Sequence, residues 1–172
     1  VGTGDVEVQA TPDVSLSYSD NDTNMKEDLI PTSRENAVKG LLKTSDKCVD
    51  SRGFSACSLY EFTVTNDSDV SQVINITMTP TENGYQNLEY SLYQGTMDEL
   101  DENSTPIVSN QKLAYNSLAP ITFNDITETI LASDDISYTI MFYLYDTGKN
   151  QVTDDSDKSF RANIRINSIT TG

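Results

Sequence analysis

The chain has 172 residues, of which 36% are hydrophobic and 22% charged, a composition typical of a globular domain rather than a disordered segment. This length suffices for one domain with a sizeable core, whereas two domains would each be small. Eleven Lys and Arg against 27 Asp and Glu give a formal net charge of −16. So acidic a surface repels nucleic-acid phosphates and anionic lipid, which disfavours both as partners.

No run of 18 or more apolar residues occurs, so the sequence predicts no membrane span. The chain opens on Val1, without an initiator Met or a signal peptide. We expect a mature exported chain from which the signal peptide has been removed, although a trimmed piece of a longer chain would begin in the same way.

The first predicted element is a strand within an N-terminal arm, residues 1–12. Val6, Val8 and Ala10 alternate with polar residues, which predicts a strand with one apolar face. This strand can pair within its own sheet. Alternatively, it is a donor strand that adds to an open edge of the next subunit, where pockets would accept Val6 and Val8. Residues 13–172 form the predicted single sandwich domain.

Two acidic segments are candidates for a weak calcium site. Residues 20–24 match the first five positions of an EF-hand loop, D-x-D-x-N, but Met25 and Pro31 then replace the required Gly and Glu. Residues 154–157 form a second acidic cluster. Incidental loop acidity is the favoured interpretation of both segments and a weak calcium site outside the EF-hand pattern is the alternative, so no cofactor is expected beyond weakly held Ca²⁺. The candidate ligands are Asp20, Asp22, Asn24, Asp154, Asp155 and Asp157.

One segment has helical periodicity and predicts a short helix over about 33–43. Thr32 and Glu35 can form a capping box at its start. We expect this helix to pack over one edge or end of the sandwich. The apolar residues that share one of its faces are Ala37, Val38, Leu41 and Leu42.

Two cysteines, Cys48 and Cys57, flank the turn-forming segment 50–53. A short hairpin would bring the thiols together, and a disulfide there would stabilise the fold by roughly 2–3 kcal/mol. Two free thiols in a cytosolic protein are the alternative, and a metal pair lacks further soft ligands. The disulfide is the favoured reading, and it indicates an oxidising, extracytoplasmic setting.

Most of the remaining sequence alternates between apolar and polar residues, with turn-forming Asn, Asp and Gly between the runs. This pattern predicts an all-β fold, an antiparallel β-sandwich of jelly-roll or immunoglobulin-like type with the one short helix. The clear strands are 14–18, 60–64, 74–78, 88–92, 136–144 and 160–166, and weaker ones are 106–109, 121–124 and 126–131.

The sequence lacks the common catalytic motifs. It contains no His, which excludes Ser-His-Asp and Cys-His nucleophilic systems and the HExxH zinc helix. Carboxylate neighbours such as Asp134 and Asp135 arise by chance among 27 acidic residues. We therefore expect a protein that is not an enzyme. Sequons for N-glycosylation, several of which are also expected by chance, occur at Asn21, Asn66, Asn75 and Asn103.

The stretch Cys57-Ser-Leu-Tyr-Glu-Phe-Thr-Val-Thr-Asn66, with 73–80 and 88–93 after it, resembles exported Gram-positive surface proteins of the TasA/camelysin type. Such proteins often carry a strand ending in V-x-N and a later strand reading L-x-Y-x-L. The resemblance implies a jelly-roll-like sandwich that polymerises into biofilm-matrix fibres by donating an N-terminal strand. The metalloprotease activity credited to camelysin-like members is not implied, because this chain has no His.

Residues and resemblance together predict a structural subunit of an extracellular fibre or surface layer, located at the cell surface and binding its own copies. The alternative is a monomeric adhesin or carbohydrate-binding module whose partner is a carbohydrate or a host surface. An exposed aromatic strip would favour this alternative, and the candidates are Tyr85, Tyr93, Tyr115, Tyr143 and Tyr145.

Overall fold

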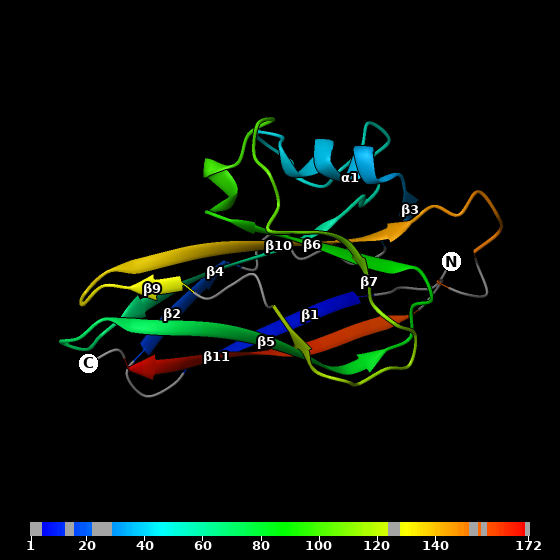
Figure 1. The fold of residues 1–172 in the computed structure, drawn as a ribbon. Coiled ribbons are helices and arrows are strands. Elements are labelled where there is room, and N and C mark those ends of the chain that lie inside the picture. Colours follow the sequence, from blue (N-terminus) through cyan, green and yellow to red (C-terminus); the bar gives the residue numbers. More distant parts are fainter. Residues whose placement is uncertain are drawn as a thin grey trace.

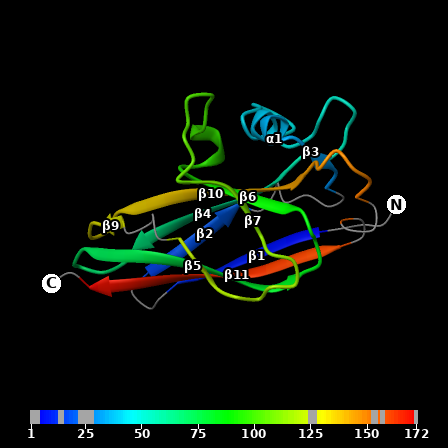
Figure 2. The same ribbon diagram turned by 45° about the vertical axis from the view of Figure 1, so that its right-hand side comes forward.

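The described residues of a computed structural model form a β-sandwich of two sheets with one short α-helix (Figures 1 and 2). The predicted fold class is therefore confirmed. The described ranges are 5–12, 16–21, 29–123, 128–151, 155 and 158–170. In the first sheet the strands are β1 (Asp5–Pro12), β11 (Ser159–Thr170), β5 (Gln72–Asn83) and β8 (Ile121–Thr122), with β9 (Glu128–Ile130) also paired to β5.

The second sheet contains the strands of the Cys57–Asn66 and L-x-Y-x-L segments. The described pairings of both sheets are antiparallel, except that β1 pairs in parallel with β11 and residues 31–32 pair in parallel with residues 144–145. Its strands in spatial order are β2 (Leu16–Asn21), β4 (Ser58–Asn66), β10 (Asp135–Tyr145), β6 (Leu88–Gln94) and β7 (Val108–Lys112), and β3 (Pro31–Thr32) lies beside β10.

The main core lies between the two sheets. The apolar positions of β5 face it, and Ile74, Ile76 and Met78 are fully buried there. Phe142 of the second sheet meets Phe160 of the first, with ring centroids 5.5 Å apart. Fully burying one such side chain contributes roughly 1.5–3 kcal/mol, so this alternating set of residues supplies most of the stabilisation.

A second, smaller core covers the outer face of the second sheet. Tyr93, Met141 and Tyr143 point outward from that sheet and pack against Ala37 and Leu41 of helix α1 (Arg34–Leu41). The expectation that the helix packs over an edge or end is therefore wrong. The stretch 140–144 is apolar at every position, so both faces of β10 must be covered, and α1 lies across the face (Figure 1).

The helix begins one residue later than the predicted capping box requires. Ser33 is the N-cap, and its Oγ accepts a hydrogen bond from the Asn36 backbone N–H at 3.1 Å. Thr32 belongs to β3 instead, where it pairs with Tyr145. A capping box does form elsewhere, between Thr96 and Glu99 of the 3₁₀ helix η1 (Met97–Glu99).

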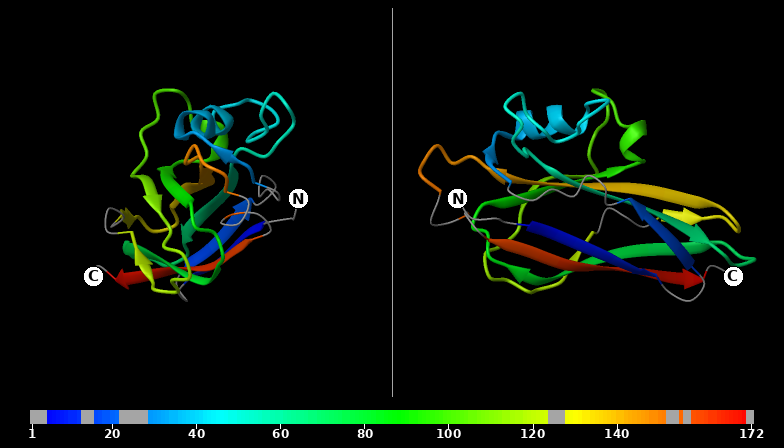
Figure 3. Two further views of the ribbon diagram at one scale, coloured as in Figure 1. Left: turned by 90° about the vertical axis from the view of Figure 1, so that its right-hand side faces the viewer. Right: turned by 180° about the vertical axis from the view of Figure 1, so that it is seen from behind.

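We call α1, the hairpin closed by Cys48 and Cys57, and η1 together the cap. Figure 3 shows the cap as a layer over one side of the sandwich, with η1 at one end and the hairpin turn and β3 at the other. Among the residues described, no helix combines the length and the apolar composition that crossing a bilayer requires.

Candidate functional site

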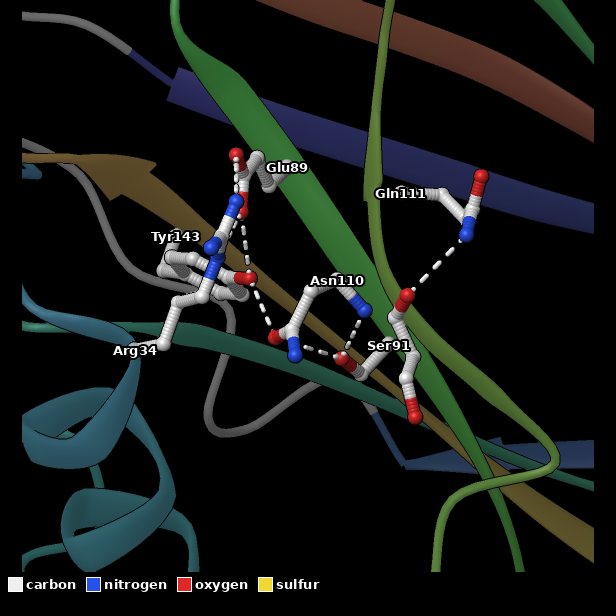
Figure 4. A network of polar contacts seen from close by, with 7 residues as sticks. Arg34, Glu89, Ser91, Asn110, Gln111 and Tyr143 are labelled. Atoms are coloured by element: carbon white, nitrogen blue, oxygen red, sulfur yellow. Dashed lines mark hydrogen bonds and ion pairs between the residues drawn. The ribbon is translucent and has the colours of Figure 1, made fainter.

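A polar network fastens the cap to the second sheet. Arg34 of α1 donates from Nε and Nη2 to the two carboxylate oxygens of Glu89 on β6, each at 2.9 Å. The Tyr143 hydroxyl lies 2.7 Å from Glu89 Oε1 and 2.6 Å from Asn110 Oδ1, and the Asn110 backbone N–H donates to Ser91 Oγ at 2.9 Å. Figure 4 shows these side chains converging from α1, β6, β7 and β10.

The members of this network differ in how deeply they are buried. The Glu89 side chain is only 7% exposed, whereas Arg34 is 46% exposed. The hydrogen bond to Glu89 raises the pKa of Arg34 above its ordinary value. Burial, reinforced by the same carboxylate, raises the pKa of Tyr143 well above 10. The Arg34 guanidinium also lies 4.5 Å above the centroid of the Tyr145 ring. Each charge is paired, so the network holds the cap in place.

The Cys48–Cys57 hairpin forms as the sequence predicts. The two sulfurs are bonded, and the Cα atoms are 4.8 Å apart. Asp50 closes the turn, because its Oδ1 accepts hydrogen bonds from the backbone N–H groups of Arg52 and Phe54 at 2.9 and 3.0 Å. The Phe54 N–H is the largest cause that lowers the pKa of Asp50. The disulfide prediction is confirmed.

A cavity of about 540 Å³ opens between α1, the hairpin and the end of β3. Three of its lining residues are cations, Lys39, Lys43 and Arg52, although the chain as a whole is strongly acidic. Its volume lies in the range of sites that bind small ligands or peptide side chains. Sequence reasoning missed this site because its cations come from two segments that only the fold brings together.

The N-terminal strand lies at the edge of the first sheet. β1 pairs in parallel with β11 over eight residues, from Asp5 opposite Ser159 to Pro12 opposite Ile166. The predicted donor residues Val6, Val8 and Ala10 stand opposite Phe160, Ala162 and Ile164. In this chain the arm thus takes the in-chain pairing, which is one of the two arrangements that the sequence leaves open.

The predicted calcium ligands are placed only in part. Asp155 is buried, and its carboxylate accepts four hydrogen bonds: from the backbone N–H groups of Gln86 and Asn87, and from the side-chain amides of Asn87 and Gln151. Asp20 is exposed on β2 and accepts a hydrogen bond from the Tyr60 hydroxyl at 2.9 Å. The other candidates, Asp22, Asn24, Asp154 and Asp157, lie outside the described residues.

Asp155 therefore anchors its own loop to the connection between β5 and β6. All four partners are N–H donors, and they occupy the carboxylate oxygens that would otherwise be available to bind a cation. Within the described part of the chain, no group of three or more Cys, Asp or Glu is arranged to hold a metal ion.

The asparagine of the V-x-N motif has a structural role. Asn66 is fully buried at the end of β4, and its Nδ2 donates to the carbonyls of Val70 at 2.8 Å and Ile130 at 2.9 Å. Its Oδ1 accepts from the Ser68 backbone N–H at 2.9 Å. The side-chain amide of this sequon is thus occupied inside the fold, whereas Asn103 lies in an exposed turn.

The tyrosines proposed for a carbohydrate-binding strip do not form one. Tyr85, Tyr93 and Tyr143 are buried, and each belongs to a core cluster. Tyr145 is half-buried beneath Arg34, which leaves Tyr115, at 52% exposure, as the one strongly exposed member of the five. The adhesin alternative therefore loses the feature that would have favoured it.

Comparison with known proteins assigns no family. No family model and no curated protein matches the chain. Among solved structures, the VP2 subviral particle of infectious bursal disease virus aligns at 12% identity and a TM-score of 0.29, covering 56% of this chain and 30% of VP2. The chain thus spans less than a third of VP2.

A second solved structure, AvmM, which catalyses macrocyclization in alchivemycin A biosynthesis, aligns at 5% identity and a TM-score of 0.36. The alignment covers 94% of this chain and 90% of AvmM. TM-scores this low carry no argument about function.

Proposed function

We propose that the chain is a structural subunit of an extracellular protein fibre or surface layer, in which an N-terminal strand is donated from one subunit to the next. The observation that carries the proposal is the position of β1. It is the first of the described strands, it lies at a sheet edge, and among the described residues it pairs only with β11.

The energetics of β1 favour exchange between copies. When β1 leaves, β11 loses an eight-residue ladder and becomes an open edge, which is a template for another strand. A second copy of the same segment restores every main-chain hydrogen bond in the same register. The exchange therefore changes little in enthalpy, and strand exchange of this kind is a common route to oligomers.

The receiving strand, β11, has a row of apolar residues that must be kept from water. Phe160, Ala162, Ile164 and Ile166 alternate along β11, and each is buried in the main core. Loss of β1 would bring this row close to water, so binding of another strand to the open edge of β11 is favoured. A neighbouring subunit with an unpaired arm supplies the complementary strand.

The remaining features fit an extracellular structural role. The disulfide is typical of proteins that fold in oxidising compartments. Arg34 of the cap is held by Glu89 of β6 through two hydrogen bonds. The resemblance to TasA/camelysin-type proteins leads to the same proposal from the sequence side. On this basis the protein is exported, associates mainly with its own copies, and performs no catalysis.

Truncation of the arm tests the proposal. Deleting residues 1–12 removes β1, whereas deleting residues 1–4 leaves it intact and serves as the matched control. We expect the control to form fibres in negative-stain electron microscopy and the longer deletion to remain a folded monomer with native circular dichroism. A synthetic peptide of residues 1–12 should bind that monomer in a one-to-one ratio. Fibres of normal appearance from the longer deletion would contradict strand donation.

A further inference from the structure

One segment, which runs from α1 into the disulfide hairpin, has the opposite charge to the rest of the molecule. Residues 34–52 contain five Lys and Arg against three Asp and Glu, while the remaining chain contains six basic and 24 acidic residues. Nearly half of the cations of this acidic protein therefore belong to one segment. Because the segment folds onto one face of the second sheet, it forms a basic region on an acidic body.

The cations of this region gather around the cavity at one end of the cap. Lys39 and Arg52 both line it, and their side chains are 68% and 67% exposed. Lys43 also lines it and donates to the Val49 carbonyl oxygen. Two carboxylates also line the cavity, Asp50 and Asp146.

Both of these carboxylates already accept hydrogen bonds from their own turns. Asp50 accepts the Arg52 and Phe54 backbone N–H groups, and Asp146 Oδ1 accepts the Gly148 backbone N–H at 2.8 Å. Lys39 and Arg52, in contrast, each form an ion pair with a near neighbour in the sequence, and ion pairs of this kind at a surface contribute little. An anionic group that enters the cavity can therefore displace these weak ion pairs and form its own ion pairs with the cations.

The other end of the cap carries the complementary charge. The segment 98–102 reads Asp-Glu-Leu-Asp-Glu, and its four carboxylate residues are exposed. Leu100 and the preceding Met97 pack into the smaller core, so the acidic segment projects from a fixed base. Figures 1 and 3 place η1 and the β3 side of the cap at opposite ends of the layer.

We infer that the basic cavity of one subunit receives the acidic segment 98–102 of a second copy. The two surfaces differ, and they lie at opposite ends of one layer, so the contact is heterologous and repeats from copy to copy. A contact made of exposed ion pairs is weak in isolation. It gains strength along a fibre, where other contacts raise the effective concentration of the partner. The inference rests on the proposed self-assembly for its choice of partner.

Charge reversal at each surface tests the contact in the full chain. The cavity variant carries Lys39→Glu and Arg52→Glu, and the segment variant carries Asp98→Lys and Glu102→Lys; Glu99 is left alone because it caps η1. Each variant alone should need a roughly tenfold higher protein concentration for assembly at low salt, since it meets like charge in its own copies. An equimolar mixture should regain wild-type assembly, because each reversed surface then finds a complementary one.

Two control variants separate this contact from net charge. Lys112→Glu with Lys149→Glu, and Asp67→Lys with Asp69→Lys, make the same changes in charge on exposed residues outside the cap. They should assemble like the parent. The parent should also lose the contribution of the contact as salt rises above about 0.15 M, where the Debye length falls to about 8 Å.

The outcomes distinguish this inference from strand donation. If both reversed variants assemble like the parent, or if their mixture does no better than either alone, the cap contact is wrong while strand donation stands. If deleting residues 1–12 leaves fibres unchanged but the mixture restores assembly, strand donation is wrong and the cap contact stands.

Discussion

Arg34 and Glu89 are 55 residues apart in the sequence and meet through two parallel hydrogen bonds of 2.9 Å. The pair joins the first turn of α1 to the outer face of β6, where Glu89 is almost completely buried. A two-point pairing of this kind fixes orientation as well as distance. It is therefore the main polar determinant of where the cap lies on the second sheet.

Replacing Arg34 with Met should lower the free energy of unfolding by about 2 kcal/mol, because Glu89 would stay buried without its cation. Urea denaturation at pH 7 measures the change. Replacing both residues with Met should recover part of the loss, since no buried charge is then left unpaired. The exposed Lys39–Glu35 pair is the matched control, and breaking it should change stability by less than about 0.5 kcal/mol. An Arg34 variant as stable as the parent would contradict the assignment.

Alkaline pH should destabilise the protein through its buried tyrosines. Burial raises the pKa of Tyr90 to about 12 and also raises the pKa values of Tyr93 and Tyr143. Because the folded pKa lies above the unfolded value of about 10, the folded state retains protons that the unfolded state loses. The stabilisation is complete below pH 10 and is lost as pH rises toward 12.

The Tyr90→Phe variant tests this directly. Between pH 9 and 12 its free energy of unfolding should fall by less than that of the parent, by a difference on the order of 2 kcal/mol. Tyr115→Phe, which removes the hydroxyl of an exposed tyrosine, is the matched control. Identical alkaline profiles for the parent and the Tyr90 variant would show that this hydroxyl is not buried.

Gly40→Ala should destabilise the cap even though Ala is the better helix former. A Cβ at this position would lie 3.1 Å from Cys48 Cα, a backbone atom held by the disulfide. The clash should outweigh the gain of about 1 kcal/mol in helix propensity, so thermal unfolding should occur at a lower temperature. Lys39→Ala, one residue earlier and exposed, is the control and should have little effect. A more stable Gly40 variant would mean that α1 sits further from Cys48.

Asn66→Asp should cost about 2 kcal/mol or more. The exchange removes the two donors to Val70 and Ile130 and places a carboxylate oxygen against their carbonyls. Asn103→Asp, in an exposed turn, should be neutral. Chemical denaturation of the two variants compares them, and equal stability would rule out a structural role for the Asn66 hydrogen bonds to Val70 and Ile130. In a glycosylating host, peptide mapping should find no glycan on Asn66 of folded protein.

Much of this fold can be predicted from the sequence because its strands and turns are specified by residues that are close together in the chain. Alternation at period two identifies most strands, and the turn between Cys48 and Cys57 predicts the disulfide. The cap is harder to place. Glu89 and Ser91 alternate with apolar residues as solvent-facing residues do, yet both are buried. Their burial depends on Arg34 and Asn110, which are distant in the sequence.

The other features that could not be predicted depend on contacts between residues that are far apart in the sequence. The parallel register of β1 on β11 joins residues about 150 positions apart, and no local signal encodes it. The four donors to Asp155 come from two separate loops, so its acidic neighbours in the sequence suggest a cation instead. The cavity at the end of the cap likewise combines residues of α1, β3 and the disulfide hairpin.

Strand donation makes a prediction that in-chain pairing cannot make. Gln9 and Asn163 stand opposite each other in the β1–β11 register. We would prepare two single variants, Gln9→Cys and Asn163→Cys, mix them before assembly, oxidise the assembled material, and separate it on a non-reducing denaturing gel. In this mixture a disulfide between positions 9 and 163 can form only between different molecules.

We expect covalent heterodimers from the mixture that disappear on reduction, and a ladder of longer oligomers from the Gln9→Cys, Asn163→Cys double variant. Each single variant assembled alone gives the background of other cross-links. A mixture that yields no heterodimer, with a double variant that cross-links only within monomers, would contradict strand donation. A double variant that stops at dimers would show closed exchange between two molecules rather than a fibre.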